Sequence, residues 1–258
     1  YSDKYIIANY STSGVRNWYK VINNRGQLKD VVSTENGYTA AGESYSQDLG
    51  KGDLADISPY GGYDAVIISF DTEGNMLWSD SFGGSGNDGF LGITAVSDGY
   101  VTAGYAYASS FGNGTLSDIV NKGGSDAVAV KYDTEGRRSW ITTFGGSGAD
   151  RFNKIKCISD SLYIACGYTF PSGTEDTEGL TGYGNTDAAL IQLEDLPLEI
   201  IPGDIDGNGI VNRIDSALLL KYLSNILLLS PEQLEAADIN GDGDIDITDC
   251  VLILNENK

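Results

Sequence analysis

The chain has 258 residues, of which 37 are acidic, 16 are basic and none is histidine, so its formal net charge is −21. This charge excludes nucleic acid as a main partner, because little in the chain could neutralise a phosphate backbone. The missing histidine excludes Ser-His-Asp and Cys-His catalysis and every histidine-ligated metal site. No run of 18 apolar residues is present, so the sequence predicts no membrane-spanning helix.

Internal repeats fill the first 195 residues and are the main evidence on their fold. The segment DAVIISFDTEG at 64–74 recurs 62 residues later as DAVAVKYDTEG at 126–136. FGGSGND at 82–88 recurs with the same shift as FGGSGAD at 144–150, and a fourth copy begins at 187–193 and breaks off. The three tryptophans of the chain fall at one position of three copies: Trp18, Trp78 and Trp140.

Each copy is predicted to form four short strands, which in the second copy are 65–70, 76–82, 90–96 and 100–106. Asp-Thr-Glu-Gly and Ser-Asp-Gly between the strands are predicted hairpin turns, in which glycine supplies a positive φ. FGGSG is also predicted to be a structural turn, because neither a helix nor a lysine follows it to bind phosphate. Four strands in a repeat of about 60 residues are typical of β-propeller blades.

With their FGGSGxD and DxxG motifs, the repeats resemble the propeller-like repeats of bacterial surface and secreted proteins. The resemblance covers about 3–195 and implies a mainly β fold of propeller-like four-stranded repeats, in about three copies plus one strand. Either a longer ring has been cut at its N-terminal end, or 187–193 helps to close a small ring. A β-solenoid or a sandwich of the same strands is the alternative.

Carboxylate chemistry is the form of catalysis that remains open without histidine. The acidic residues that recur in turns are Asp71, Glu73, Asp88, Asp133, Glu135 and Asp150. A catalytic acid and base need unequal environments, whereas these residues occupy equivalent positions. The sequence therefore predicts turn formers and no catalytic residue, and a carboxylate-dependent glycoside hydrolase or lyase is the alternative.

Long loops between the repeats, roughly 43–63, 105–125 and 168–186, are rich in aromatic residues. Their aromatic residues are Tyr45, Tyr60, Tyr63, Tyr105, Tyr107, Phe111, Phe170 and Tyr183. Aromatic faces on a rigid scaffold can stack on sugar rings or on a protein partner. A carbohydrate-binding accessory module is thus an alternative to a non-catalytic interaction module, unless most of these side chains fill the core or anchor the loops.

Three cysteines provide no disulfide framework. Cys157 and Cys166 are predicted on neighbouring strands, where they form either a cross-strand disulfide or two buried thiols, and Cys250 is predicted to pack within a helix. The predicted division is a β-repeat domain, a linker with two prolines and a C-terminal domain: 1–195, 196–202 and 203–258.

The C-terminal domain contains the same twelve-residue pattern twice, as DIDGNGIVNRID and DINGDGDIDITD. A calcium loop supplies oxygen ligands from positions 1, 3, 5, 7 and 12, with glycine at position 6 and a main-chain carbonyl at position 7. The ligands predicted from this spacing are Asp204, Asp206, Asn208, Ile210 and Asp215 in the first loop, and Asp238, Asn240, Asp242, Asp244 and Asp249 in the second. Both loops have Asp rather than Glu at position 12, which a slightly closer helix accommodates.

An apolar helix is predicted after each loop, at 216–223 and 250–254, and Ser-Pro-Glu-Gln at 230–233 is a helix start with a capping box. A core this small cannot fold alone, so the metal must supply folding free energy. Calcium removal is therefore predicted to unfold this domain.

Two such loops, 34 residues apart and each followed by an apolar helix, resemble a type I dockerin over roughly 203–258. The resemblance implies two bound Ca²⁺ ions and binding to a cohesin module of a scaffoldin. It also implies a secreted component of a cellulosome-type assembly for polysaccharide degradation, extracellular or attached to the cell surface, whose signal peptide was removed upstream.

In the dockerin family, partner choice depends largely on loop positions 10 and 11 and on the helix that follows. The partner-binding residues that the resemblance implies are Arg213, Ile214, Leu220, Lys221, Ile247 and Thr248. Because the two copies differ at these positions, we expect one preferred orientation on the scaffoldin.

Overall fold

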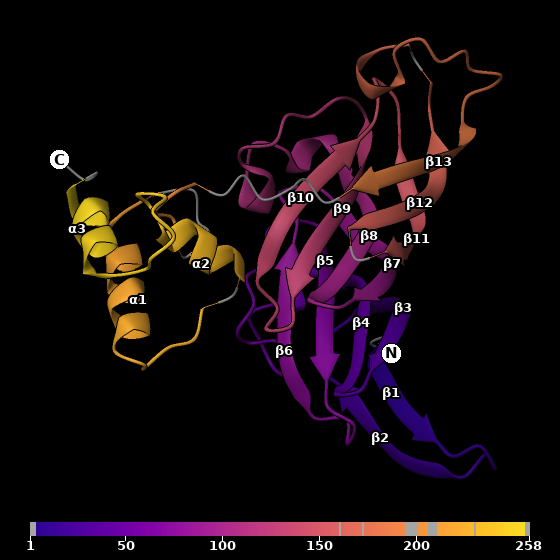
Figure 1. Cartoon of the computed structure of the whole chain (residues 1–258). Helices are drawn as coiled ribbons and strands as arrows, with labels where there is room; N and C mark the ends of the chain where they lie inside the picture. Colours follow the sequence, from indigo (N-terminus) through magenta and orange to yellow (C-terminus); the bar gives the residue numbers. More distant parts are fainter. Residues whose placement is uncertain are drawn as a thin grey trace. The chain divides into compact units, whose positions relative to one another are not determined.

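The computed structural model describes residues 4–159, 161–171, 173–194, 201–205, 211–229 and 231–255 (Figure 1). The chain divides into two compact units, Tyr1–Glu194 and Asp195–Lys258. The first unit is built of antiparallel strands and the second of three short helices, so the predicted mainly β fold with a small helical C-terminal region is confirmed.

The described part of the first unit contains four antiparallel sheets, in which strands that follow one another in the chain are neighbours. Their strands are β1 (Tyr5–Tyr10) and β2 (Arg16–Ile22) in the first sheet; β3 (Gly26–Thr34), β4 (Gly37–Tyr45), β5 (Tyr63–Phe70) and β6 (Met76–Phe82) in the second; β7 (Asp88–Val96), β8 (Gly99–Tyr107), β9 (Ser125–Asp133) and β10 (Arg138–Phe144) in the third; and β11 (Arg151–Ser159), β12 (Leu162–Thr169) and β13 (Asp187–Glu194) in the fourth.

The second and third sheets each contain the last two strands of one sequence repeat and the first two strands of the next. The four strands predicted for the second copy are present as β5 to β8, but β6 is the last strand of the second sheet and β7 the first strand of the third. The chain crosses between the sheets at Gly83, where φ is 149° and a Cβ would lie 2.4 Å from the Asp88 carboxylate. Only glycine fits this crossing.

From the second sheet on, successive sheets pack face to face (Figure 1). The first strand of the third sheet lies on the second sheet, and the first strand of the fourth sheet lies on the third. β7 contacts β3, β4 and β5, and β11 contacts β7, β8 and β9. The first of these junctions buries, among others, Ala65, Ile67, Phe90 and Ile93. The next junction buries their counterparts Ala127, Ala129, Phe152 and Ile155.

The repeated tryptophans cover the repeated hairpin turns of the following sheet. The indole N–H of Trp78 on β6 donates to the carbonyl of Thr134, at 2.8 Å, in the turn between β9 and β10. A Cβ on Gly136 in that turn would lie 2.5 Å from the Trp78 ring, and a Cβ on Gly74 would lie 2.6 Å from Trp18. The Trp and Asp-Thr-Glu-Gly motifs therefore form one structural contact.

Sheet pairing among the described residues does not close a ring. No strand joins the first sheet, which has two strands, to the fourth, which has three. One interpretation of the sequence expects residues 187–193 to help close a small ring. In the structure these residues form part of β13, which pairs with β12.

The two cysteines of the fourth sheet are not bonded to each other. Cys157 lies opposite Tyr163 and Cys166 opposite Lys154, because the register places the two cysteines at different positions along the strand pair. The disulfide alternative is therefore wrong, and so is the prediction that both thiols are buried, since Cys166 is exposed. The prediction that Cys250 packs within a helix is confirmed by its burial.

The second unit contains α1 (Arg213–Leu223), α2 (Pro231–Ala237) and α3 (Ile247–Asn255). Its buried core consists of Ile205, Leu219, Ala237, Cys250 and Ile253. α1 starts three residues before the predicted 216, because Asn212 accepts the N–H of Ile214 and Asp215 accepts the N–H of Asn212 in a capping box. α3 also starts three residues before the predicted 250, because Asp246 and Asp249 make the equivalent bonds. No helix in the described residues is long and apolar enough to cross a membrane.

Candidate functional site

The second predicted calcium loop is described along its whole length and folds as a series of tight turns. Asp238 accepts the N–H of Asp242 through Oδ1, at 3.1 Å, and the N–H of Gly243 through Oδ2, at 2.9 Å. Asn240 also accepts from Asp242 N–H, at 2.8 Å, and Asp242 accepts from Asp244 N–H, at 2.9 Å. Gly243 has a φ of 86°, as expected of the sharp turn at position 6.

Position 12 of this loop is a buried carboxylate in the first turn of α3. Asp249 Oδ2 accepts the N–H of Asp246 at 3.0 Å, whereas Asp249 Oδ1 is buried and has no hydrogen-bond partner. A buried carboxylate oxygen without a partner is costly, and a cation beside it would remove that cost. The oxygen donors of this loop therefore fit a hard cation such as calcium.

The first predicted loop is described at its two ends. Asp206, Asn208 and Ile210 lie outside the described residues. Asp215, at position 12, is fully buried and accepts Ile205 N–H at 2.9 Å and Asn212 N–H at 2.8 Å.

Positions 1 and 12 of this loop are both buried carboxylates, because Asp204 is also largely buried. Asp215 in α1 corresponds to Asp249 in α3, and each accepts a backbone N–H from three residues earlier in the chain. The duplication seen in the sequence is thus also present in the local structure.

Contacts between α1 and α3 join the two loop-helix segments. Leu219 and Ile253 are buried together in the core of the unit, and Ser216 Oγ donates to the Cys250 carbonyl at 3.4 Å. In the part of the unit that the structure describes, the carboxylates do not converge on one point: no group of three or more Asp, Glu or Cys side chains is placed to hold a metal ion. Calcium loops also use amide and carbonyl oxygens, which such a group does not include.

The six residues predicted to contact a partner lie at the ends of α1 and at the start of α3. All six are exposed: Arg213, Ile214, Leu220, Lys221, Ile247 and Thr248. Thr248 also donates hydrogen bonds to Asp246, which lower the pKa of that carboxyl.

Sequence reasoning missed Val251 and Leu254, two of the three further exposed apolar residues of α3; the third is Leu252. Val251 and Leu254 follow Ile247 at spacings of four and seven, which places them and Ile247 on one side of the helix. That spacing is the signal that could have found them.

Repeated acidic residues of the first unit act as hydrogen-bond acceptors in turns. Asp71 accepts the N–H groups of Glu73 and Asn75, and Asp133 accepts the equivalent N–H groups two and four residues later. Asp88 accepts Gly84 N–H at 2.9 Å, and Asp150 accepts its counterpart, Gly146 N–H, at 3.0 Å. Their predicted role as turn formers agrees with these bonds.

Four of the repeated carboxylates are fully buried where strands of the first unit begin. They are Asp64, Asp88, Asp126 and Asp150. Burial raises the pKa of Asp88 to about 7 and that of Asp126 to about 6. Asp64 and Asp126 were not singled out in the sequence, although their positions recur in the DAV segments.

Most of the loop aromatics are anchored in the first unit. The rings of Tyr45 and Tyr63 lie 4.2 Å apart, Tyr105 donates to Glu43 at 3.2 Å, and Phe111 packs against the core. The exposed aromatics among the eight are Tyr107, Phe170 and Tyr183, of which Tyr183 is 93% exposed.

Residues 202–256 match the family model of the dockerin type I domain. A search of curated proteins found no match to the chain. The C-terminal segment is thus a dockerin type I domain, preceded by a β-rich region. Dockerin domains bind calcium and a cohesin partner, so the match supports a component of cellulosome type.

Proposed function

We propose that the protein is a secreted component of a cellulosome-type assembly, which its dockerin docks on a cohesin module of a scaffoldin in the presence of calcium. The observation that carries the proposal is the dockerin match at residues 202–256. The cargo is the β-repeat domain, 1–195, a propeller-like and non-catalytic interaction module. Residues 196–202 are the linker to the dockerin, 203–258.

Two calcium ions stabilise the dockerin in this proposal, one in each loop. The buried and unpartnered Oδ1 of Asp249 supports the second of these sites, because a cation would compensate it. Asp204 and Asp215 supply the first and last ligands of the other loop. Since the core of this unit is small, calcium contributes a large part of its folding free energy.

Cohesin contacts the exposed side chains at the two loop-helix segments. The first segment presents two cations, Arg213 and Lys221, and the second presents Ile247 and Thr248. An acidic patch on the cohesin would therefore distinguish the two segments, which supports one preferred orientation.

Titration calorimetry against a panel of cohesins, in calcium and in excess chelator, tests this function. Binding to at least one cohesin in calcium and none in chelator is the expected result. Replacing both Arg213 and Lys221 by Glu tests the orientation, with the same charge change at the exposed Lys156 and Lys20 of the first unit as a control. Binding that persists without calcium would contradict the proposal.

Carbohydrate binding by the β-repeat domain is the second candidate function. The exposed rings of Tyr107, Phe170 and Tyr183 favour it, because exposed aromatic faces stack on sugar rings. Pull-down on insoluble plant polysaccharides, with the chain and with a variant in which all three are Ala, tests it. Retention of the chain and loss of the variant are expected, and no retention on any polysaccharide would exclude this candidate.

A further inference from the structure

Among the described strands, β1 has an unpaired edge. It pairs with β2 on one side, and no described strand pairs with its other side. The equivalents of β1 are β5 and β9, because Trp18, Trp78 and Trp140 hold the same position on the following strand. β5 pairs with β4 as well as β6, and β9 pairs with β8 as well as β10. An unpaired edge beside complete sheets is a place where a further strand can bind.

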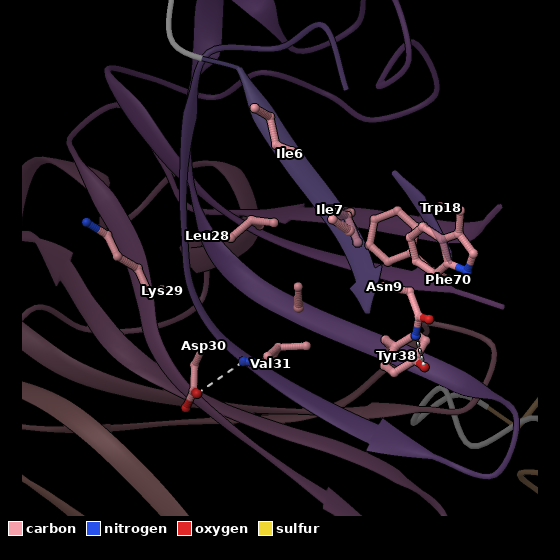
Figure 2. A pocket seen from close by; sticks show the side chains of 12 residues that line it. Ile6, Ile7, Asn9, Trp18, Leu28, Lys29, Asp30, Val31, Tyr38 and Phe70 are labelled. Atoms are coloured by element: carbon pink, nitrogen blue, oxygen red, sulfur yellow. Dashed lines mark hydrogen bonds between the residues drawn. The ribbon is translucent and has the colours of Figure 1, made fainter. Parts of the chain in front are cut away.

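An apolar hollow of about 470 Å³ lies between this edge strand and the second sheet (Figure 2). Its apolar lining includes Ile7, Trp18, Leu28, Val31, Ala40 and Phe70. Two apolar side chains at its rim are exposed to water, Ile6 by 68% and Val31 by 60%. A ligand with apolar side chains would remove this surface from water.

Polar side chains around the hollow already have partners. Asn9 donates to Tyr38 Oη at 3.1 Å, as Figure 2 shows, and Lys29 forms a 3.0 Å ion pair with Glu43. Asp30 forms a 3.0 Å ion pair with Lys154. Few polar side chains are thus left for a sugar or an ionic ligand, whereas the unpaired edge offers backbone N–H and C=O groups. This combination suits an extended peptide strand.

The two complete sheets define the chemistry of that strand. The strands paired with β5 and β9 are GYTAAGESY in β4 and GYVTAGYAY in β8. In the third sheet, Tyr100 lies opposite Tyr132 and Ala103 opposite Ala129. The corresponding pairs in the second sheet are Tyr38 with Phe70 and Ala41 with Ile67. The shared pattern is Gly-Tyr-x-x-Ala-Gly.

The glycine of this pattern indicates that the bound strand is the second strand of a β-hairpin. A Cβ on Gly42 would lie 2.0 Å from the carbonyl of Gln27 in β3, and a Cβ on Gly104 would lie 1.8 Å from the carbonyl of Gly89 in β7. The glycine is therefore required by the first strand of the same hairpin.

We propose that β1 binds a β-hairpin of this repeat type, whose second strand pairs antiparallel with β1. By the register of the complete sheets, the tyrosine of the Gly-Tyr-x-x-Ala-Gly strand lies opposite Tyr10 and its alanine opposite Ile7. Its apolar side chains fill the hollow and cover Ile6 and Val31. The first unit is thus an acceptor for a hairpin that matches its own repeats.

A synthetic peptide of residues 88–107, which form the hairpin of β7 and β8, is the probe for this site. Binding of the peptide to the full chain is followed by hydrogen exchange of the β1 amides. It is also followed by the fluorescence of Trp18, in a variant of the full chain with Trp78 and Trp140 replaced by Phe. We expect saturable binding of one peptide per chain, with β1 exchange slowed by about tenfold or more. The same peptide with Tyr100→Lys and Ala103→Lys should not bind.

A matched pair of variants localises the binding. Val31→Glu places a charge in the hollow, and Val120→Glu places one on a loop residue that is 79% exposed and does not line it. Both positions are exposed, so both variants should fold. Val31→Glu should weaken peptide binding by about tenfold or more, and Val120→Glu should not.

Three results would overturn the proposal. They are unchanged β1 exchange at saturating peptide, equal affinity of the two valine variants, and a dimer by light scattering in which the β1 amides are protected without peptide. The last result would mean that a second copy of the chain occupies the edge.

Discussion

The two units of this chain bury their acidic residues for different purposes. In the first unit, Asp88 and Asp150 are fully buried and accept backbone N–H groups of tight turns between large apolar junctions. In the dockerin, Asp215 and Asp249 are equally buried, but the core around them contains only a few residues. The comparison indicates that apolar packing stabilises the first unit, whereas in the proposed function a cation compensates the carboxylates of the second.

Calcium removal should produce the largest difference in stability between the two units. We expect excess chelator to abolish the unfolding transition of the dockerin in scanning calorimetry, because its core is too small without metal. The transition of the β-repeat unit should keep its midpoint. Two transitions that respond equally to chelator would contradict this difference between the units.

Removal of the Asp249 carboxylate should come next in size. Asp249→Ala deletes a predicted ligand, and we expect the calcium concentration at half-folding of the dockerin to rise by about 100-fold, or about 3 kcal/mol. Circular dichroism during a calcium titration measures it. Glu235→Gln, at an exposed acid of α2, is the control and should leave the titration unchanged.

A cavity at the first junction should affect the β-repeat unit alone. Phe90 is fully buried and stacks on Phe82 with ring centroids 5.5 Å apart. Phe90→Ala should lower the free energy of unfolding of that unit by about 3–5 kcal/mol, as measured in urea. Tyr183→Ala, at an exposed ring, should change it little, and a large loss there would show that the loop aromatics also stabilise the fold.

A buried carboxyl group should make the stability of the β-repeat unit depend on pH. Burial raises the pKa of Asp88 to about 7, whereas an unfolded Asp titrates near 3.9. Between these values the folded state binds more protons, so the stability of the β-repeat unit should fall as the pH rises from about 4 to 7, by up to about 4 kcal/mol.

Calorimetry at several pH values, with and without Asp88→Asn, tests this trend. Asp88→Asn should reduce this pH dependence without abolishing it, because burial also raises the pKa of Asp126 to about 6. A dependence that Asp88→Asn leaves unchanged would show that Asp88 does not contribute to it.

The smallest effect should come from the tryptophan contact between sheets. Trp78→Phe keeps most of the ring but removes the hydrogen bond to the Thr134 carbonyl. We expect a loss of about 0.5–1.5 kcal/mol, confined to the β-repeat unit. Urea denaturation followed by tyrosine fluorescence measures it, and a loss above about 3 kcal/mol would mean that the ring edge packs more tightly than the hydrogen bond alone suggests.

Local signals predicted the elements well. Repeated Asp-Thr-Glu-Gly and Ser-Asp-Gly turns located the strands. The caps Asn212 and Asp246 were overlooked, so α1 and α3 both start three residues before their predicted positions. The division of strands between sheets was not predictable in this way. β6 and β7 follow each other as closely as a hairpin would, but the buried Asp88 and the backbone of Gly83 send the chain to the next sheet.

Side-chain environments of single residues were the least predictable part. Cys166 in the fourth sheet occupies the position that Ala103 has in the third. The fourth sheet covers Ala103, whereas no described sheet covers the equivalent face of the fourth sheet, so Cys166 is exposed. For the dockerin, spacing alone predicts the loop residues, because calcium geometry is encoded in the order of a dozen positions. A long-range contact between sheets has no such local code.

The contact of Trp78 with Gly136 and Thr134 also bears on how such a chain can evolve. The ring is recognised by a main-chain carbonyl and by the missing side chain of a glycine, so it depends little on which other residues the next repeat contains. A duplicated segment that contains both the Trp and the Asp-Thr-Glu-Gly turn could form this contact with the repeat before it and with the repeat after it. Gene duplication can therefore lengthen or shorten this domain by whole repeats without compensating mutations elsewhere.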